Sequence, residues 1–227
     1  MTDKIPLIKL LCNKKIIMHE RDLYFWIKFG NRKNMESLMT SGTLFMQRLS
    51  KFREIEEEER GDPDDGIDHS LQPNQTQLLI NGGAINGVAG PIRIIENASV
   101  NPLIYCLYAF TSDHLKTIGK NYIDKRCLEF GDTVVIIKGA DFYERIKTKC
   151  DKIKAEIEGK LVNYVDRSYH GKMGPFKKYS NFKHQSEYRF VLNSNIKDEN
   201  YKFDIGPIED IAELHPADKV NDIIKIA

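Results

Sequence analysis

Residues 178–192, KYSNFKHQSEYRFVL, contain the pattern that most constrains the fold. Side chains alternate between the two faces of an extended strand. A strand starting at Gln185 would therefore place Gln185, Glu187 and Arg189 on one face. Its other face would carry three apolar side chains: Tyr188, Phe190 and Leu192. Burial of the apolar face would hold the Glu187 carboxylate rigidly at the sheet surface, as a catalytic site requires. The same alternation is typical of any half-buried antiparallel strand, and on pattern alone it favours a purely structural role.

The overall composition predicts one globular domain spanning residues 1–227. The chain is 41% hydrophobic and 30% charged, which suffices for a sizeable core. Its formal charge of +1 gives no overall field that would draw it to nucleic acid or to a membrane. No apolar stretch approaches the roughly 20 residues of a membrane-spanning helix. We therefore expect no membrane partner.

The cysteines and the N-terminus indicate a cellular location. Four cysteines are scattered without a short paired spacing, and no signal-peptide pattern opens the chain. These features predict a cytoplasmic protein with reduced thiols. Residues 1–18 mix lysines with short apolar groups and are interpreted as an N-terminal arm.

Hydrophobic patterns predict the main elements. Strands are expected at 21–29, 43–47, 103–110, 133–138, 161–165 and 201–205. A helix capped by Asn31 or Asn34 should end at Gly42, and a second should run from about Phe142 to Gly159 with Cys150 on its core face. Ser112 or Asp113 should cap a third helix. Because strands neighbour one another in sequence, the pattern predicts a mixed α+β domain with a largely antiparallel or split β-sheet flanked by helices.

Two loops invite functional interpretation. The acidic run Glu54–Glu59 is interpreted as a solvated helical face, and the following DPDDG (62–66) as a loop with a tight turn. The alternative is a loop that binds a divalent metal ion, but the calcium-binding pattern starting at Asp62 fails at Gly66, Ile67 and Pro73. NGGAINGVAG (81–90) lacks either phosphate-binding glycine motif, and it predicts a flexible hairpin connection.

Basic residues gather near the central stretch. Five lie between residues 166 and 178, and two follow: Arg167, His170, Lys172, Lys177, Lys178, Lys183 and His184. Such a cluster can meet phosphates or stay solvated. It makes a phosphate-bearing ligand, such as NAD, a nucleotide or RNA, the expected partner.

Taken in order, these segments resemble a widespread bacterial family of uncharacterised domains from mobile and phage-defence gene neighbourhoods. The resemblance rests on an aromatic strand, NMESLMTSG with TLFM, the FRE…RGDPDDG segment, YCLYAFTS, and FKHQSEYRFVL followed by IGPIEDI. That layout in turn resembles the split-sheet fold of the ADP-ribosyltransferases.

The resemblance implies an NAD site and assigns residues to it. Gln185-Ser186-Glu187 resembles the Q-x-E turn, Thr111-Ser112 the hydroxyl position, and Arg21 or Tyr24 the first-strand residue that meets the dinucleotide. Glu187 would then stabilise the positive ribosyl centre as nicotinamide leaves. Gln185 would orient the acceptor, and Arg189 would pair with a phosphate or neutralise Glu187.

Three function classes follow. The first is an NAD-dependent ADP-ribosyltransferase-like effector of phage defence or toxin–antitoxin conflict, which modifies a protein or nucleic-acid acceptor and has a possible protein partner or antitoxin. The second is a defence nuclease, in which Asp132, Glu187 and Lys183 would converge on a magnesium ion. The third is a non-catalytic nucleotide-sensing or protein-binding module. The first and third function classes involve no metal site.

Overall fold

The structure is a computed structural model that describes residues 16–18, 21–55, 61–96, 101–116, 122–193 and 196–224. Residues 1–15 of the predicted arm and 56–60 of the acidic run lie outside the described residues.

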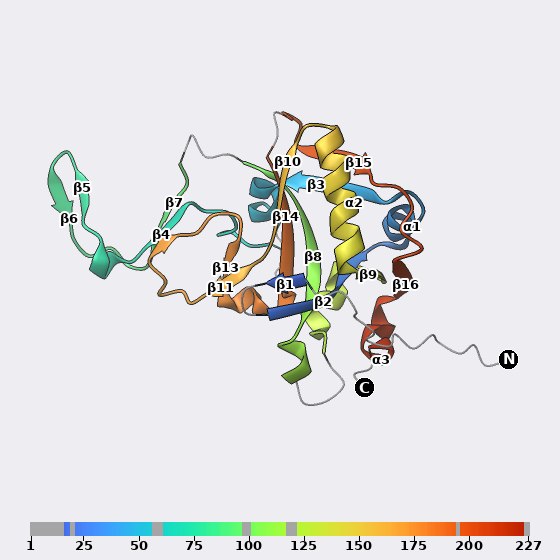
Figure 1. Cartoon of the computed structure of the whole chain (residues 1–227). Helices are drawn as coiled ribbons and strands as arrows, with labels where there is room; N and C mark the ends of the chain where they lie inside the picture. The colour runs from blue at the N-terminus through green and yellow to red at the C-terminus, as the bar shows by residue number, and fades with distance from the viewer. Residues whose placement is uncertain are drawn as a thin grey trace.

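The fold is a mixed α+β domain built on a large antiparallel sheet, as the sequence predicts (Figure 1). Within the described residues this sheet has nine strands, in the order β10-β14-β8-β2-β9-β16, with β1 beside β2 and β15 beside β3, which joins β8. The strands are β1 (Ile16–Met18), β2 (Arg21–Gly30), β3 (Thr43–Arg48), β8 (Leu103–Thr111), β9 (Thr133–Lys138), β10 (Glu156–Leu161), β14 (Glu187–Asn193), β15 (Asn200–Asp204) and β16 (Ala212–Pro216).

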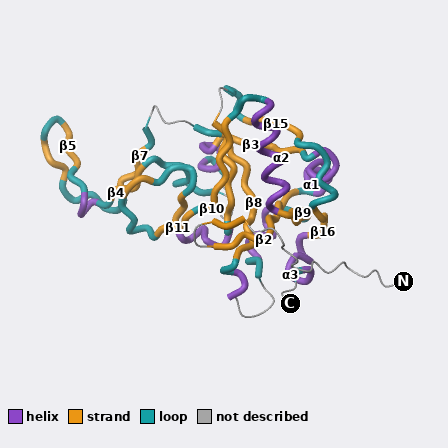
Figure 2. The backbone as a smooth tube through the Cα atoms, in the orientation of Figure 1, coloured by secondary structure: helices purple, strands orange, loops and turns teal. Residues whose placement is uncertain are grey.

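Shorter strands, most of them to one side of this sheet, and several helices complete the fold (Figure 2). The small strands are β4 (His69–Leu71), β5 (Leu78–Ile80), β6 (Gly83–Ile85), β7 (Ile92–Ile94), β11 (Asn163–Val165), β12 (Gly171–Lys172) and β13 (Lys177–Tyr179). The helices are α1 (Arg32–Ser41), α2 (Gly139–Lys152) and α3 (Val220–Ile223), with 3-10 helices η1 (Leu49–Arg53), η2 (Pro73–Gln75), η3 (His114–Lys116), η4 (Lys125–Phe130), η5 (Ser180–Gln185) and η6 (Ala217–Lys219).

The main core lies between the sheet and helices α1 and α2. Trp26 of β2 is fully buried there and packs against Phe142 of α2 and Phe190 of β14. The three apolar side chains predicted for one face of β14, Tyr188, Phe190 and Leu192, all belong to this core. Their burial confirms the predicted register of β14, so Glu187 and Arg189 project from the opposite face.

The sheet is split where β2 and β8 separate. Their registered pairing ends at Ile27 opposite Tyr108, and β3 pairs with β8 only at Ile104 and Leu103. On the edge of β8 that faces β2 and β3, residues 105–107 therefore have no registered partner among the described strands. The Lys28 ammonium bridges the gap by donating to the Cys106 carbonyl at 2.8 Å. This opening positions the pocket described below.

Helix α1 forms as its caps predict. The Asn34 amide donates to the Asn31 side chain at 2.9 Å, which satisfies a backbone group at the helix start. Gly42 ends the helix with φ +62°, and a Cβ there would lie 2.0 Å from the Gly206 carbonyl oxygen. Only glycine fits this left-handed close approach.

Three expectations about element boundaries are wrong. Gln185 lies in η5 rather than in a strand, and Ser186, with φ +39°, turns the chain into β14. Helix α2 ends at Lys152, so Gly159 lies inside β10 instead of ending a helix. After Ser112 the structure describes the short η3, and residues 117–121 of the predicted third helix lie outside the described residues. The connection at 81–90 itself contains β6, which pairs with β5.

No helix in the described ranges is long and apolar enough to cross a membrane.

Candidate functional site

A buried cluster of ion pairs surrounds Glu187 at the start of β14. Arg189 donates to both Glu187 carboxylate oxygens at 3.0 Å through its Nε and one terminal nitrogen. The same guanidinium binds both oxygens of Asp65 at 2.7 and 2.6 Å. The side chains of Arg189 and Asp65 are both 0% exposed. Arg189 therefore neutralises Glu187, the second of the two roles expected for it.

Lys178 completes the cluster from the neighbouring β13. Its ammonium lies 3.1 Å from Glu187 and 3.3 Å from Asp65. It also donates to the Gln185 side-chain oxygen at 2.8 Å. Gln185 and Glu187 thus come together as predicted, although a 3-10 turn and a lysine bring them together rather than a shared strand face.

The cluster holds Glu187 ionised. Burial opposes ionisation of the carboxyl group, but the charges of Arg189 and Lys178 outweigh burial and lower its pKa below the usual range. Burial likewise disfavours the charged lysine, yet Asp65 and Glu187 raise the pKa of Lys178. Two carboxylates and two cations compensate one another, so Glu187 stays ionised at the edge of the pocket while these four groups together carry no net charge.

The acidic loop before β4 buries three of its carboxylates. Asp62, Asp64 and Asp65 are all buried. Asp64 lies 2.6 Å from Arg93, and burial raises the pKa of Asp62 to about 6, with Asp65 adding to the shift. The turn itself is as predicted, but its carboxylates are interior because Arg189, Lys178 and Arg93 provide counter-charges.

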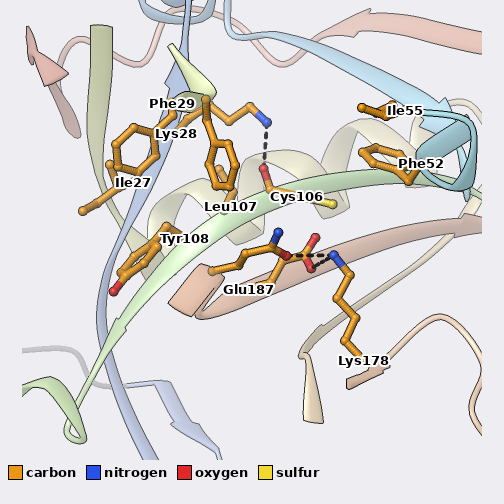
Figure 3. Close-up of a pocket in the computed structure, with 12 residues that line it drawn as sticks. Ile27, Lys28, Phe29, Phe52, Ile55, Cys106, Leu107, Tyr108, Lys178 and Glu187 are labelled. Atoms are coloured by element: carbon orange, nitrogen blue, oxygen red, sulfur yellow. Dashed lines mark hydrogen bonds and ion pairs between the residues drawn. The ribbon is translucent and has the colours of Figure 1, made fainter. Parts of the chain in front are cut away.

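A pocket of about 160 Å³ opens beside Glu187 at the split of the sheet. Figure 3 shows Phe29 and Tyr108 on one side, Phe52 and Ile55 on the other, and Glu187 with Lys178 at the polar end. Phe130, Cys106, Leu107, Gln185, Ile27 and Lys28 complete the lining. The arrangement suits a flat aromatic ring with a polar edge.

A wider cleft of about 680 Å³ shares part of this lining. Lys28, Phe29, Phe52, Cys106 and Phe130 border both spaces. The wider cleft continues along α1 and β3 and includes a second lysine, Lys202. The two spaces together can accommodate a ligand larger than one ring.

Cys106 is poorly suited to act as a nucleophile in this pocket. Burial raises the pKa of its thiol well above the ordinary value, and the nearby Glu187 charge adds to the shift. Cys150 is also buried, as predicted from its helical spacing, and burial raises its pKa to about 11.

The other predicted cofactor residues lie apart from Glu187. Thr111 lines a separate pocket of about 520 Å³ with His114 and Ser186, and its amide donates to His114 at 3.0 Å. The Ser112 amide donates to the Asp22 carbonyl at 2.9 Å. Tyr24 is absent from the lining of the Glu187 pocket and packs at the edge of an apolar cluster that includes Phe25 and Phe110. The side chain of Arg21 lies outside the described residues. Tyr108 connects the two pockets because it lines both.

The predicted basic cluster is dispersed. Lys178 is buried against Glu187, whereas Lys183 and His184 line the Thr111 pocket. Arg167 stacks over the Tyr179 ring, and Lys177 donates to the Lys172 carbonyl. These side chains therefore do not form one surface beside Glu187.

The structure gives no geometric support to a magnesium nuclease. Asp132 precedes β9, and β8 and β2 separate that strand from β14, which is roughly 14 Å at the usual strand spacing. Among the described residues, no group of three or more His, Cys, Asp or Glu side chains is arranged to hold a metal ion.

Sequence reasoning missed Asp65, Lys28 and Phe52 as site residues, and it assigned Lys178 to a cluster for phosphates rather than to an ion pair with Glu187. One signal could have found Asp65. An arginine on a buried strand face requires counter-charge, and the acid-rich segment 62–65 is a candidate source.

Comparisons with protein-family models, with curated proteins and with solved structures find no match to this chain. The resemblance to a phage-defence family and to ADP-ribosyltransferases therefore stays a prediction based on motifs.

Proposed function

We propose that the pocket beside Glu187 binds the planar ring of a phosphate-bearing nucleotide, with NAD as the first candidate. The observation that carries this proposal is a fixed carboxylate at the polar end of an aromatic-walled pocket, at the split of the sheet. A cavity of about 150 Å³ is enough for a benzene-sized ring. The remaining ribose and phosphates would extend into the wider cleft.

Charge supports the same placement. Lys28 borders both spaces, and Lys202 borders the wider one. Ammonium groups at a cleft attract phosphate groups. A nucleotide with its ring beside Glu187 would therefore direct its phosphates toward these lysines.

The reaction we propose is ADP-ribosyl transfer. The bond between the ribose C1′ and the nicotinamide nitrogen breaks, and its electron pair leaves with neutral nicotinamide. The Glu187 carboxylate stabilises positive charge that develops on the ribose. An acceptor nucleophile then bonds to C1′ and loses its proton. In this proposal the protein is a cytoplasmic defence effector, and the acceptor is a protein or a nucleic acid.

A second candidate is a nucleotide-sensing module without chemistry. It is favoured by the pairing of both Glu187 oxygens with Arg189 and of one with Lys178. A carboxylate neutralised in this way stabilises a cation less well than an unpaired one.

Titration calorimetry and nicotinamide release distinguish these candidates. The transferase predicts saturable NAD binding, release of nicotinamide and transfer of labelled ADP-ribose to cell extract, all insensitive to EDTA. Phe52→Ala should weaken NAD binding, whereas Leu115→Ala, at an exposed site outside this pocket, should not. Binding without release would establish the sensor. Absence of binding to NAD and to other nucleotides at millimolar concentration would contradict both.

A further inference from the structure

The hairpin formed by β5 and β6 projects away from the main sheet (Figures 1 and 2). Within the described strands, β5 and β6 register only with each other. Asn81 and Gly82 form its turn with positive φ angles of 49° and 81°, the geometry of a tight hairpin turn. Each strand therefore has one unpaired backbone edge.

This hairpin exposes aliphatic side chains. Leu79 and Ile80 of β5 are 58% and 64% exposed, and Ile85 of β6 is 39% exposed. An isolated two-stranded hairpin is only marginally stable in water, and added strands stabilise it. Exposed apolar strands with free edges favour pairing with another chain.

The hairpin also lies in an uncharged part of the sequence. No Asp, Glu, Lys, Arg or His occurs between His69 and Arg93, although 30% of the chain is charged. Strand edges are usually protected by charge or proline, and here prolines occur only at the two ends, Pro73 and Pro91. The edge of β5 is thus left open to a partner strand.

We propose that β5 pairs antiparallel with β5 of a second copy of this chain. A two-fold axis at Leu79 would place Leu79 opposite its own copy and Leu78 opposite Ile80, giving a four-stranded sheet. In such an arrangement a central charge would face its own copy, and like charges opposite each other destabilise a sheet. The absence of charge favours a second copy over a charged partner. This interface is separate from the proposed nucleotide site.

The oligomeric state tests the proposal. Light scattering and sedimentation velocity from low to high micromolar concentration should show a reversible dimer. Leu79→Lys should give a monomer with an unchanged melting temperature, and Leu115→Lys, at an exposed apolar site elsewhere, should leave the dimer intact. A wild-type monomer at every concentration, open-ended association, or a dimer that survives Leu79→Lys would overturn the proposal.

Cross-linking tests the register. Opposed Cβ atoms in an antiparallel pair lie about 4.5–5.5 Å apart. Leu79→Cys should cross-link efficiently with a short bis-maleimide, far more than the wild type with its native cysteines or than Asn86→Cys beyond β6. Equal cross-linking of the three proteins would contradict pairing at β5.

Discussion

Arg189 and Asp65 form a two-point ion pair across 124 positions of the chain, at 2.7 and 2.6 Å. The pair holds the acidic loop 62–66 against β14, the strand that carries Glu187. Because both side chains are fully buried, neither charge can be solvated if its partner is lost. The geometry of Glu187 therefore depends on a loop far away in sequence.

Asp65→Asn should destabilise the fold strongly. The change leaves the buried Arg189 charge partly uncompensated, a defect that typically costs about 3–5 kcal/mol. Urea unfolding measures the loss. Asp210→Asn breaks the ion pair of an exposed carboxylate with Arg145 and should change stability little. Equal effects of the two substitutions would mean that the Asp65–Arg189 pair does not stabilise the fold.

Glu187→Gln should reduce both activity and stability. Glu187 compensates two buried cations, so its loss affects the fold as well as the reaction. We expect a loss of roughly 3 kcal/mol in unfolding free energy. Nicotinamide release should fall about 100-fold to 1,000-fold, as when one transition-state stabiliser is removed. Measurements at low temperature, with folding checked by circular dichroism, separate the two effects. Full turnover by the folded variant would place the catalytic carboxylate elsewhere.

The pH dependence of stability should report on Asp62. Its pKa rises from 3.8 to about 6 on folding, so the folded state disfavours its ionised form. The contribution of Asp62 ionisation to the free energy of unfolding is zero below pH 3.8. It becomes increasingly unfavourable up to pH 6 and is constant above that pH. Asp62→Asn should therefore raise the free energy of unfolding at pH 7–8 by roughly 2–3 kcal/mol, and by nothing near pH 3. Asparagine retains the Oδ1 atom that accepts from the Asp64 amide. A gain of equal size at both pH values would rule out titration as its cause.

The sequence predicted the strands and the first helix because their signals are local. Alternation in β14, the continuous apolar run of β8, and the caps of α1 each lie within about ten residues. The site depends on long-range contacts that no local pattern encodes. Asp65 and Lys178 look like solvated charges in sequence, and only the fold brings them to Arg189. The end of α2 was missed because Ile157 fits a helical spacing as well as it fits alternation in β10.

Phe190→Ala should remove about 3–5 kcal/mol of stability. The Phe190 ring is fully buried and packs against Trp26, Tyr188 and Tyr143. Truncation would leave a cavity in the main core. Phe45→Ala, at a ring that is 43% exposed, should cost much less in the same urea titration. A comparable loss for both variants would contradict the burial of Phe190.

Gly159→Ala should destabilise the protein through a contact with Tyr188. Gly159 lies in β10 opposite Phe190, and a Cβ there would lie 2.6 Å from the Tyr188 hydroxyl oxygen. Tyr188 is buried, so its ring cannot move away without disturbing the core. Overpacking of this kind typically costs about 1–3 kcal/mol.

The Tyr188→Phe background isolates this contact. Removing the hydroxyl leaves the rings of Phe190 and Tyr143 at 3.1 Å from the added methyl group. Gly159→Ala should therefore cost less stability in the Tyr188→Phe protein than in the wild type, but still some. A double-mutant cycle measured by urea unfolding should then give a coupling energy of at least about 0.5 kcal/mol. Alanine would instead stabilise an unobstructed strand position, because glycine loses more backbone entropy on folding. A stabilised Gly159→Ala protein, or a coupling near zero, would therefore show that Tyr188 does not occupy the space beside Gly159.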